Sequence, residues 1–281
     1  MKTEKDIFRR GSTTYYFSSI FFPKKIKDDV FRLYSFVRIA DDYVDVVPAN
    51  KKAFLGLRKR WELAIKDPKF DTTTTDKDSI DERVIKNIVF VARKYDFDNA
   101  WVESFLDAMQ ADLDKITYKT MKDTIWYMYG SAEVIGLMMA KIMGLPDKSL
   151  EYAKMQGRAM QYINFIRDIQ EDNDLGRSYF PQEELIKFGL KNLSKKSTQE
   201  NPQAFALFMS AQHDHYDTWQ NEADKGMQYI PKRLRVPLQT AVDMYNWTAE
   251  SIRRNPEIVF TRKVKPKKRH VIWKAGTLIL Q

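Results

Sequence analysis

The chain has 281 residues, with 47 Lys plus Arg against 38 Asp plus Glu, and so a formal net charge of +9. It has no cysteine and only three histidines, which excludes thiolate nucleophiles, disulfides, iron–sulfur clusters and cysteine-type zinc sites. Any metal ion would therefore be held by oxygen, which favours ions of the Mg²⁺ type. The ten glycines form neither G-x-G-x-x-G nor G-x-x-x-x-G-K-[ST], so these dinucleotide and P-loop motifs are absent.

Helical periodicity runs through most of the chain, interrupted at prolines and glycines, while alternating β-branched runs are scarce. The predicted helices cover residues 24–46, 51–66, 79–94, 99–115, 121–143, 148–172, 202–227 and 231–254. We expect an all-α protein with one domain over residues 1–281, about eight to ten helices around one core, and a basic tail at residues 262–281.

No uncharged stretch approaches the roughly 20 apolar residues of a membrane span, and the charged N-terminus lacks the apolar core of a signal peptide. A cytoplasmic protein is therefore expected. Six of the eight residues 262–269 are basic, which predicts peripheral contact with an anionic membrane surface. Nucleic acid is the other partner that such a basic run fits.

The predicted helix 24–46 carries an apolar stripe that continues into charged residues at spacings of three and four. In order, the stripe is Val30, Leu33, Tyr34, Val37, Arg38, Asp41 and Asp45. An amphipathic helix normally turns its apolar stripe inward, so these carboxylates are expected in a buried place. Buried carboxylates need a cation or a metal ion as a partner.

The same pattern recurs in the predicted helix 148–172. Its polar stripe is Gln161, Asn164, Asp168 and Asp172. Carboxylates four residues apart lie one turn apart on one face, about 5–6 Å between Cβ atoms, and can share hard cations. A D-x-x-x-D pair also arises by chance, as at Asp67 and Asp71, but two copies on apolar faces predict a box for metal ions. Arg38 and Arg167 beside them are suited to bind phosphate.

An acidic box without a thiol or a histidine pair favours chemistry on a metal-bound diphosphate. Metal ions neutralise the charge that develops as the C–O bond breaks, and an allylic carbon then becomes a carbocation. A cavity with few nucleophiles and with aromatic ring faces suits such a cation. Aromatic residues gather in segments poor in charge: Tyr15, Tyr16, Phe17, Phe21, Phe22, Trp126, Tyr127 and Tyr129.

These residues resemble the trans-isoprenyl diphosphate synthases of the squalene/phytoene synthase family. The matching segments are S-T-T-Y-Y at 12–16, L-Y-S-F-V-R-I-A-D-D-Y-V-D at 33–45, Y-M-Y-G at 127–130 and V-F-T-R-K-V-K at 259–265. The most specific match is Q-Y-I-N-F-I-R-D-I-Q-E-D-N-D-L-G-R-S-Y-F-P-Q-E-E-L at 161–185. The chain departs from the family pattern at Thr13, where a basic residue is common, and at Tyr15, where phenylalanine is usual.

The resemblance implies an all-α isoprenoid synthase fold and a set of site residues. The implied Mg²⁺ ligands, direct or through water, are Asp41, Asp45, Asn164, Asp168 and Asp172. The residues implied to contact the diphosphates or the cationic intermediate are Ser12, Thr14, Tyr34, Arg38, Gln161, Arg167 and Tyr245. The catalytic set is Asp41, Asp45, Asp168, Asp172, Tyr34 and Arg38, supported by Asp42 and Glu171 from the same turns.

The implied reaction is a head-to-head condensation of two prenyl diphosphates with two or three Mg²⁺ ions, or Mn²⁺. Two geranylgeranyl diphosphates giving phytoene is the favoured reading, with farnesyl diphosphate and dehydrosqualene or squalene as the alternative. No NADPH is expected. Head-to-tail prenyl transfer and terpene cyclisation compete, because D-D-x-x-D at Asp41–Asp45 satisfies their pattern too. A non-enzymatic alternative is a helical protein that binds nucleic acid or membranes. The two acidic stripes argue against nucleic acid.

Overall fold

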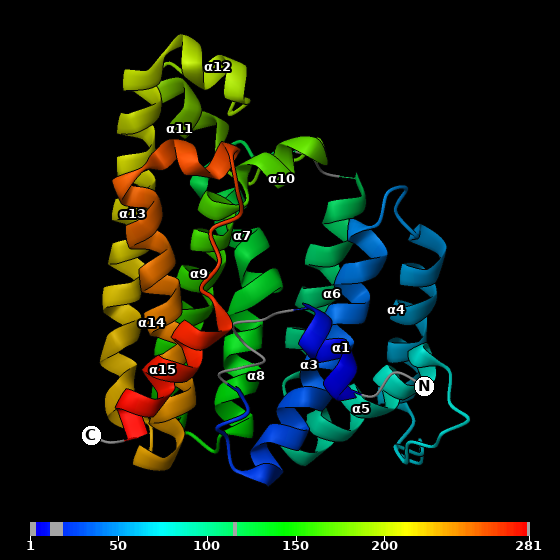
Figure 1. Cartoon of the computed structure of the whole chain (residues 1–281). Coiled ribbons are helices and arrows are strands. Elements are labelled where there is room, and N and C mark those ends of the chain that lie inside the picture. The colour runs from blue at the N-terminus through cyan, green and yellow to red at the C-terminus, as the bar shows by residue number, and fades with distance from the viewer. Residues whose placement is uncertain (1–3, 12–18, 115–116, 280–281) are drawn as a thin grey trace.

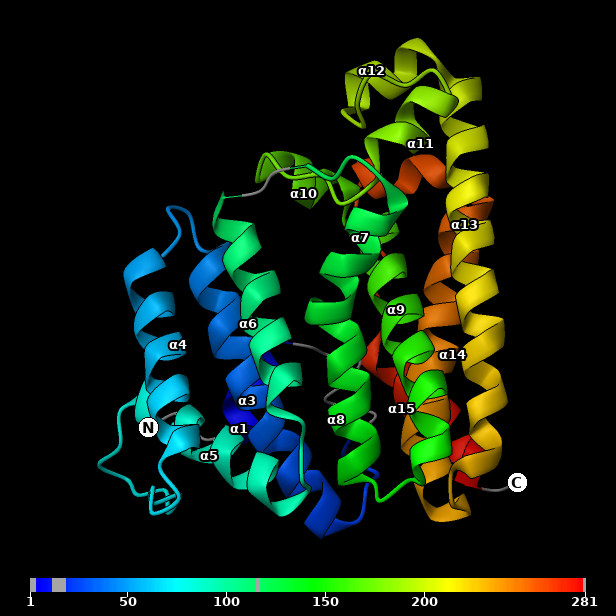
Figure 2. The same cartoon turned by 180° about the vertical axis from the view of Figure 1, so that it is seen from behind.

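The computed structural model describes residues 4–11, 19–114 and 117–279, drawn from two sides in Figures 1 and 2. Within those ranges the regular structure consists of fourteen α-helices and several short helical turns, without a β-strand. The prediction of an all-α protein is therefore confirmed. The division into a single domain over residues 1–281 stays a prediction.

The eight predicted helices are all present, with their ends displaced by a few residues. In chain order, the α-helices are α1 (Glu4–Gly11), α3 (Lys24–Asp45), α4 (Lys51–Lys66), α5 (Ile80–Lys94), α6 (Asn99–Asp114), α7 (Met121–Met128), α8 (Val134–Ile142), α9 (Leu150–Arg167), α10 (Ile169–Asp174), α11 (Gln182–Lys187), α12 (Lys195–Glu200), α13 (Pro202–Asp224), α14 (Lys232–Arg254) and α15 (Lys268–Ile279). The sequence did not predict α1, α11, α12 and α15.

Two of the predicted helices are subdivided. A π-helical turn, Tyr129–Glu133, joins α7 to α8 where one helix over 121–143 was expected. The helix expected over 148–172 is broken at Asp168, whose φ of −99° and ψ of 15° leave the α-helical range between α9 and α10. π-turns within helices are frequent at functional sites, and both interruptions lie beside the cavity described below.

The long helices are arranged as two groups with α7 and α8 between them (Figures 1 and 2). One group consists of α3, α4, α5 and α6, and the other of α9, α13, α14 and α15. α3 and α9 run in the same direction, so that their carboxyl ends lie at the end of the bundle where α10 is found (Figure 1). This direction brings both acidic motifs to one end of the molecule.

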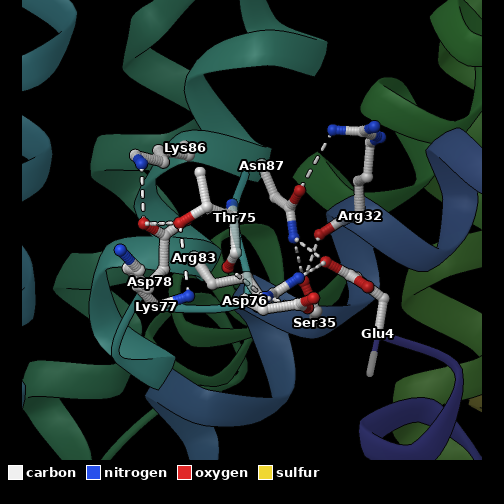
Figure 3. A network of polar contacts seen from close by, with 10 residues as sticks. All are labelled: Glu4, Arg32, Ser35, Thr75, Asp76, Lys77, Asp78, Arg83, Lys86 and Asn87. Carbon is white, nitrogen blue, oxygen red and sulfur yellow. Dashed lines mark hydrogen bonds and ion pairs between the residues drawn. The ribbon is translucent and has the colours of Figure 1, made fainter. Parts of the chain in front are cut away.

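A buried polar network ties α1 to α3 and α5 (Figure 3). The side chain of Asn87 is fully buried and donates to Glu4 at 3.1 Å and to Ser35 Oγ at 3.2 Å. It accepts from Arg32 at 3.1 Å, and Arg83 reaches Glu4 at 3.4 Å. Since a buried amide is costly unless its groups are paired, this network requires all three helices in place.

Replacing Asn87 with alanine is expected to destabilise the protein by about 2 kcal/mol, because Ser35 and Glu4 lose a buried partner. The melting temperature should fall by about 4 °C, measured by circular dichroism. Asn221→Ala, at an exposed position of α13, is the matched control and should melt like the parent. Equal melting temperatures for the two variants would contradict the role given to the network.

The basic tail expected at residues 262–281 is in large part packed against the bundle. Val264 is buried, and α15 lies along α14 with Val271 fully buried. The side chain of Lys263 reaches the acidic residues of α10, as described below. Across the described residues, no helix is both long and apolar enough to cross a bilayer.

Candidate active site

Both acidic motifs lie on the wall of one cavity of about 490 Å³. α3 contributes Asp41 and Asp45, and the region where α9 meets α10 contributes Asn164, Asp168 and Asp172. Residues more than 100 positions apart in the sequence are thus brought to one place, as the two stripes led us to expect. Their roles as metal ligands stay predictions.

The cavity wall contributed by α3 is the stripe selected from the sequence. Spacing of three and four residues puts its members on one helical face. The α3 residues on the wall are Val30, Leu33, Tyr34, Val37, Arg38, Asp41 and Asp45. Along α3 the cavity wall therefore changes from aliphatic side chains to charged ones of both signs.

The cavity also follows α9 along its whole length. The wall residues from α9 and the position after it are Tyr152, Ala153, Gln156, Gly157, Met160, Gln161, Asn164, Phe165, Arg167 and Asp168. They repeat at the spacing of one helical face, from the first turn to the last. The cavity is consequently a long channel with its acidic residues at one end and Tyr152 near the other.

Basic side chains already pair with the carboxylates of the first motif. Arg38 donates to Asp41 at 2.7 Å and also pairs with Asp42. Arg177, from the loop after α10, donates to Asp45 at 2.8 Å and to the carbonyl oxygen of Val44 at 2.7 Å. Arg177 thereby connects the two acidic motifs directly.

The second motif is held in the same way. Arg167 donates through two nitrogens to Asp168, at 2.8 and 2.5 Å. Lys263 lies 3.1 Å from Asp168 and also pairs with Glu171. Burial alone would raise the pKa of Asp168, but the hydrogen bonds and charges of Arg167 and Lys263 outweigh it and hold that pKa below its ordinary value.

Two other carboxyl groups of the site are shifted in the opposite direction. Desolvation, together with the charge on Asp45, raises the pKa of Asp41 to about 7. Desolvation and the charge on Asp168 raise the pKa of Asp172 to about 8. In both groups burial and a neighbouring negative charge disfavour the ionised form, and a bound cation would favour it.

The residues fit a hard divalent cation by their chemistry. Carboxylate and amide oxygens are the donors that Mg²⁺ prefers. Among the side chains that the structure describes, the Oδ1 atom of Asn164 is buried without a hydrogen-bond partner, and it lies in a residue of the cavity wall. Over the same residues no group of three acidic or histidine side chains is already arranged to hold a metal ion. Arg38, Arg167 and Arg177 pair with the carboxylates instead.

Four charged groups on this cavity were not predicted from the sequence as site residues: Asp112, Arg177, Lys263 and Lys265. Arg177 belongs to the G-R-x-Y-F-P part of the matching segment, but the sequence did not indicate that it pairs with Asp45. Lys263 and Lys265 belong both to the matching segment 259–265 and to the basic run at 262–269, but neither was carried over as a site residue. Asp112 carried no signal, because it lies outside both acidic motifs.

Asp112 is buried beside the first motif and accepts two hydrogen bonds. The hydroxyl of Tyr127 donates at 2.7 Å and that of Tyr179 at 3.0 Å. Burial raises the pKa of Asp112 to about 6, although the hydrogen bond from Tyr127 opposes the shift. The ring of Phe165 stacks on Tyr179 with 4.5 Å between centroids, so this polar group is surrounded by aromatic rings.

The remaining predicted residues fall in three places. Tyr34, Gln161 and Tyr245 line the cavity. Ser12 and Thr14 lie outside the described residues, as do the aromatic residues expected at 15–17. Of the other aromatic residues expected on the cavity, Phe22 and Tyr127 are there, whereas Phe21 and Tyr129 are not among its wall residues.

The expectation for Trp126 is wrong. Its side chain is 50% exposed on α7, whereas the side chain of its neighbour Tyr127 is buried. The two residues are adjacent in sequence, and consecutive positions on a helix point about 100° apart. Closeness in the sequence therefore did not show which aromatic residues line the cavity and which lie on the protein surface.

The comparisons with known proteins agree on one family. A model of the squalene/phytoene synthase family matches residues 8–270. The 15-cis-phytoene synthase of a Paracoccus species is 26% identical over 275 residues, covering 95% of this chain and 86% of the relative. That of Pantoea ananas is 29% identical over 237 residues, covering 84% of this chain and 76% of the relative.

Solved structures give the same picture of the fold. A dehydrosqualene synthase crystallised with a ligand superposes with a TM-score of 0.76 at 23% identity, covering 99% of this chain and 94% of the other. A squalene synthase from Alicyclobacillus acidocaldarius gives 0.72 at 20% identity, covering 89% and 92%. At these identities the likeness shows a shared fold.

Proposed function

The chain belongs to the squalene/phytoene synthase family, and on that premise we propose that it is a prenyltransferase joining two prenyl diphosphates head to head. One allylic substrate loses its diphosphate, and the carbocation bonds to the double bond of the second. Loss of a proton then gives a cyclopropyl diphosphate. This intermediate loses its own diphosphate, rearranges and gives up a second proton to form a linear hydrocarbon. Two diphosphates and two protons leave for each pair of substrates.

The length of the cavity along α9 supports geranylgeranyl diphosphate as the substrate and phytoene as the product. Sixteen residues separate Tyr152 from Asp168, which is about 24 Å at the rise of an α-helix. An isoprene unit adds four chain bonds and spans about 5 Å at ordinary C–C bond lengths. Four units need about 20 Å and leave room for the diphosphate, whereas three units, as in farnesyl diphosphate, leave part of the channel unfilled.

At the polar end, we assign Asp41, Asp45, Asn164, Asp168 and Asp172 to hold Mg²⁺ ions. Bound there, the ions would neutralise the charge that develops on the leaving diphosphate. In this assignment the protein's own cations bind the outer diphosphate oxygens, because guanidinium groups match their geometry. Those cations are Arg38, Arg167, Arg177 and Lys263.

Along the channel, the wall protects the carbocation from water. Leu33, Phe105, Met160 and Phe165 line it without offering a nucleophile. Aromatic faces such as that of Phe165 favour a nearby positive charge. Release of a proton, rather than reduction, completes the proposed reaction, so NADPH should have no effect on the product.

The test is the product made from geranylgeranyl diphosphate and Mg²⁺, identified by mass spectrometry with and without isopentenyl diphosphate and NADPH. Phytoene is expected in every case, with less product from farnesyl diphosphate. A product longer by one isoprene unit that requires isopentenyl diphosphate would instead mean head-to-tail transfer. A cyclic hydrocarbon from a single substrate would mean a terpene cyclase, and dehydrosqualene made in preference would reverse the assignment of chain length.

Tyr152 is expected to limit the chain length from the far end of the channel. Its ring stacks on Tyr229 with 5.7 Å between centroids, and its Cβ atom lies against Gly226, so the side chain has little freedom to move aside. Tyr152→Ala should raise kcat/KM for a C25 prenyl diphosphate relative to the C20 substrate by about tenfold. Tyr152→Phe keeps the ring and is the control. An unchanged ratio in Tyr152→Ala would show that another residue ends the channel.

A further inference from the structure

The C-terminal segment 258–281 carries most of the protein's excess charge. It contains seven basic residues, Arg262, Lys263, Lys265, Lys267, Lys268, Arg269 and Lys274, and no acidic residue. Seven of the nine net positive charges thus fall in the last 24 residues. Such a local excess attracts an anionic surface at a range of about one Debye length.

Large apolar side chains are exposed on the helix of this segment. Val271 of α15 is fully buried, but the next two residues, Ile272 and Trp273, are 50% and 64% exposed. Trp247 on the neighbouring α14 is 37% exposed, and both tryptophans border the same shallow groove. Tryptophan beside basic residues is the composition of a surface that enters the headgroup region of a bilayer.

Two acidic residues of α14 near this face, Asp243 and Glu250, are paired within the protein. Asp243 lies 3.1 Å from Lys274, and Glu250 lies 2.9 Å from Arg254. Neither carboxylate is therefore left to repel an anionic surface. Arg262, Lys267 and Arg269 are exposed, in contrast to Lys263, which is held in the active site.

The same segment leads directly from the cavity to the exposed helix. Lys263 and Lys265 line the cavity, Val264 between them is buried, and α15 begins three residues after Lys265. If the proposed function holds, both substrates carry long apolar chains and the hydrocarbon product is insoluble in water. With a bilayer contact next to the cavity, the substrates could enter from the membrane and the product could leave into it, where these apolar molecules dissolve.

We propose that α15 docks the protein on an anionic lipid surface. Trp273 and Ile272 enter the boundary between headgroups and acyl chains, while Arg262, Lys267 and Arg269 lie at the lipid phosphates. The benefit of docking rests on the proposed function, because it requires apolar substrates and an apolar product. The docking itself does not depend on turnover. The chemistry of mixed tryptophan, isoleucine and basic side chains favours a bilayer over nucleic acid, which offers no apolar layer.

The proposal is tested with the full chain and sucrose-loaded vesicles, sedimented without any prenyl substrate. Vesicles of phosphatidylcholine with about a third phosphatidylglycerol should bind the protein, and pure phosphatidylcholine should bind it at least tenfold more weakly. Trp273→Ala should lower partitioning about tenfold, and Lys267→Gln with Arg269→Gln about 25-fold. None of these positions lines the cavity, so hydrocarbon formation in detergent should be unchanged.

Trp126→Ala is the matched control, because it removes a tryptophan that is 50% exposed on α7. It should bind anionic vesicles like the parent, and circular dichroism should show that all variants are folded. Equal vesicle binding by Trp273→Ala and the parent would overturn the docking proposal. So would equal binding of the parent to neutral and anionic vesicles, or a preference of the parent for RNA over vesicles. Docking through α15 without any hydrocarbon product would overturn the proposed function alone.

Discussion

Replacing Asp41 or Asp168 with asparagine is expected to lower kcat/KM by about 10²–10³-fold. Each substitution removes one negative charge from the polar end of the cavity. If these residues hold Mg²⁺ as proposed, the substitution should weaken the binding of the cations that assist the leaving diphosphate. Asparagine keeps nearly the shape of aspartate, so the fold should persist. The rate of diphosphate release with geranylgeranyl diphosphate, followed as Mg²⁺ is titrated, measures the effect. We expect a higher Mg²⁺ requirement as well as a lower rate.

Asp71→Asn provides a matched control for both variants. Asp71 belongs to the third D-x-x-x-D pair of the sequence, but it lies in an exposed loop and accepts a hydrogen bond from the nearby backbone N–H of Thr73. The rate and the Mg²⁺ requirement of the Asp71→Asn variant should equal those of the parent. Full turnover in Asp41→Asn and Asp168→Asn, with circular dichroism unchanged, would refute the assignment of the metal site.

Periodicity within one helix was sufficient to find both acidic stripes. A carboxylate that continues an apolar stripe is visible in the sequence, because the spacing fixes which face it shares. Asp41 and Asp45 on α3, and Asp168 and Asp172 after α9, therefore reached the same cavity as expected. Their meeting across the bundle could only be inferred from the cost of burying unpaired charge.

Partners distant in the sequence could not be predicted from spacing. Arg177 pairs with Asp45 across 132 positions, and Lys263 pairs with Glu171 across 92. Either contact depends on how the loop after α10 and the segment after α14 fold back over the cavity. A basic residue in a loop carries no periodic signal, so the sequence showed these cations but left their positions undetermined.

The glycines of α8 and α9 are another feature that the sequence hid. A Cβ atom at Gly136 would lie 2.2 Å from the carbonyl oxygen of Ala153, and one at Gly157 would lie 2.4 Å from that of Ala132. The two helix backbones are therefore nearly in contact beside the cavity. Isolated glycines in a helical pattern ordinarily indicate only a weaker helix, and the approaching backbone is fixed by tertiary packing.

Arg177→Met should reduce both activity and stability, because Arg177 joins the two halves of the acidic site. Its side chain is 10% exposed and donates to Asp45 and to the carbonyl oxygen of Val44. Methionine retains much of the apolar stem but leaves the carboxylate of Asp45 without this partner. We expect a loss of about 2 kcal/mol in the free energy of unfolding, which lowers the melting temperature by about 4 °C. Turnover should fall by at least about tenfold, since the guanidinium lies at the acidic end of the cavity, where we propose that the diphosphate binds.

Arg253→Met distinguishes this effect from the loss of any arginine. Arg253 donates to Asp217 at 2.7 and 2.9 Å, but both side chains are more than 40% exposed, where an ion pair contributes little. Its melting temperature and turnover should stay within error of the parent. Arg177→Lys adds a second distinction, because lysine restores the charge but cannot reach two oxygens with a planar fork. If positioning of Asp45 matters, Arg177→Lys should recover stability more than activity, and equal recovery of both would mean that charge alone is required at this position.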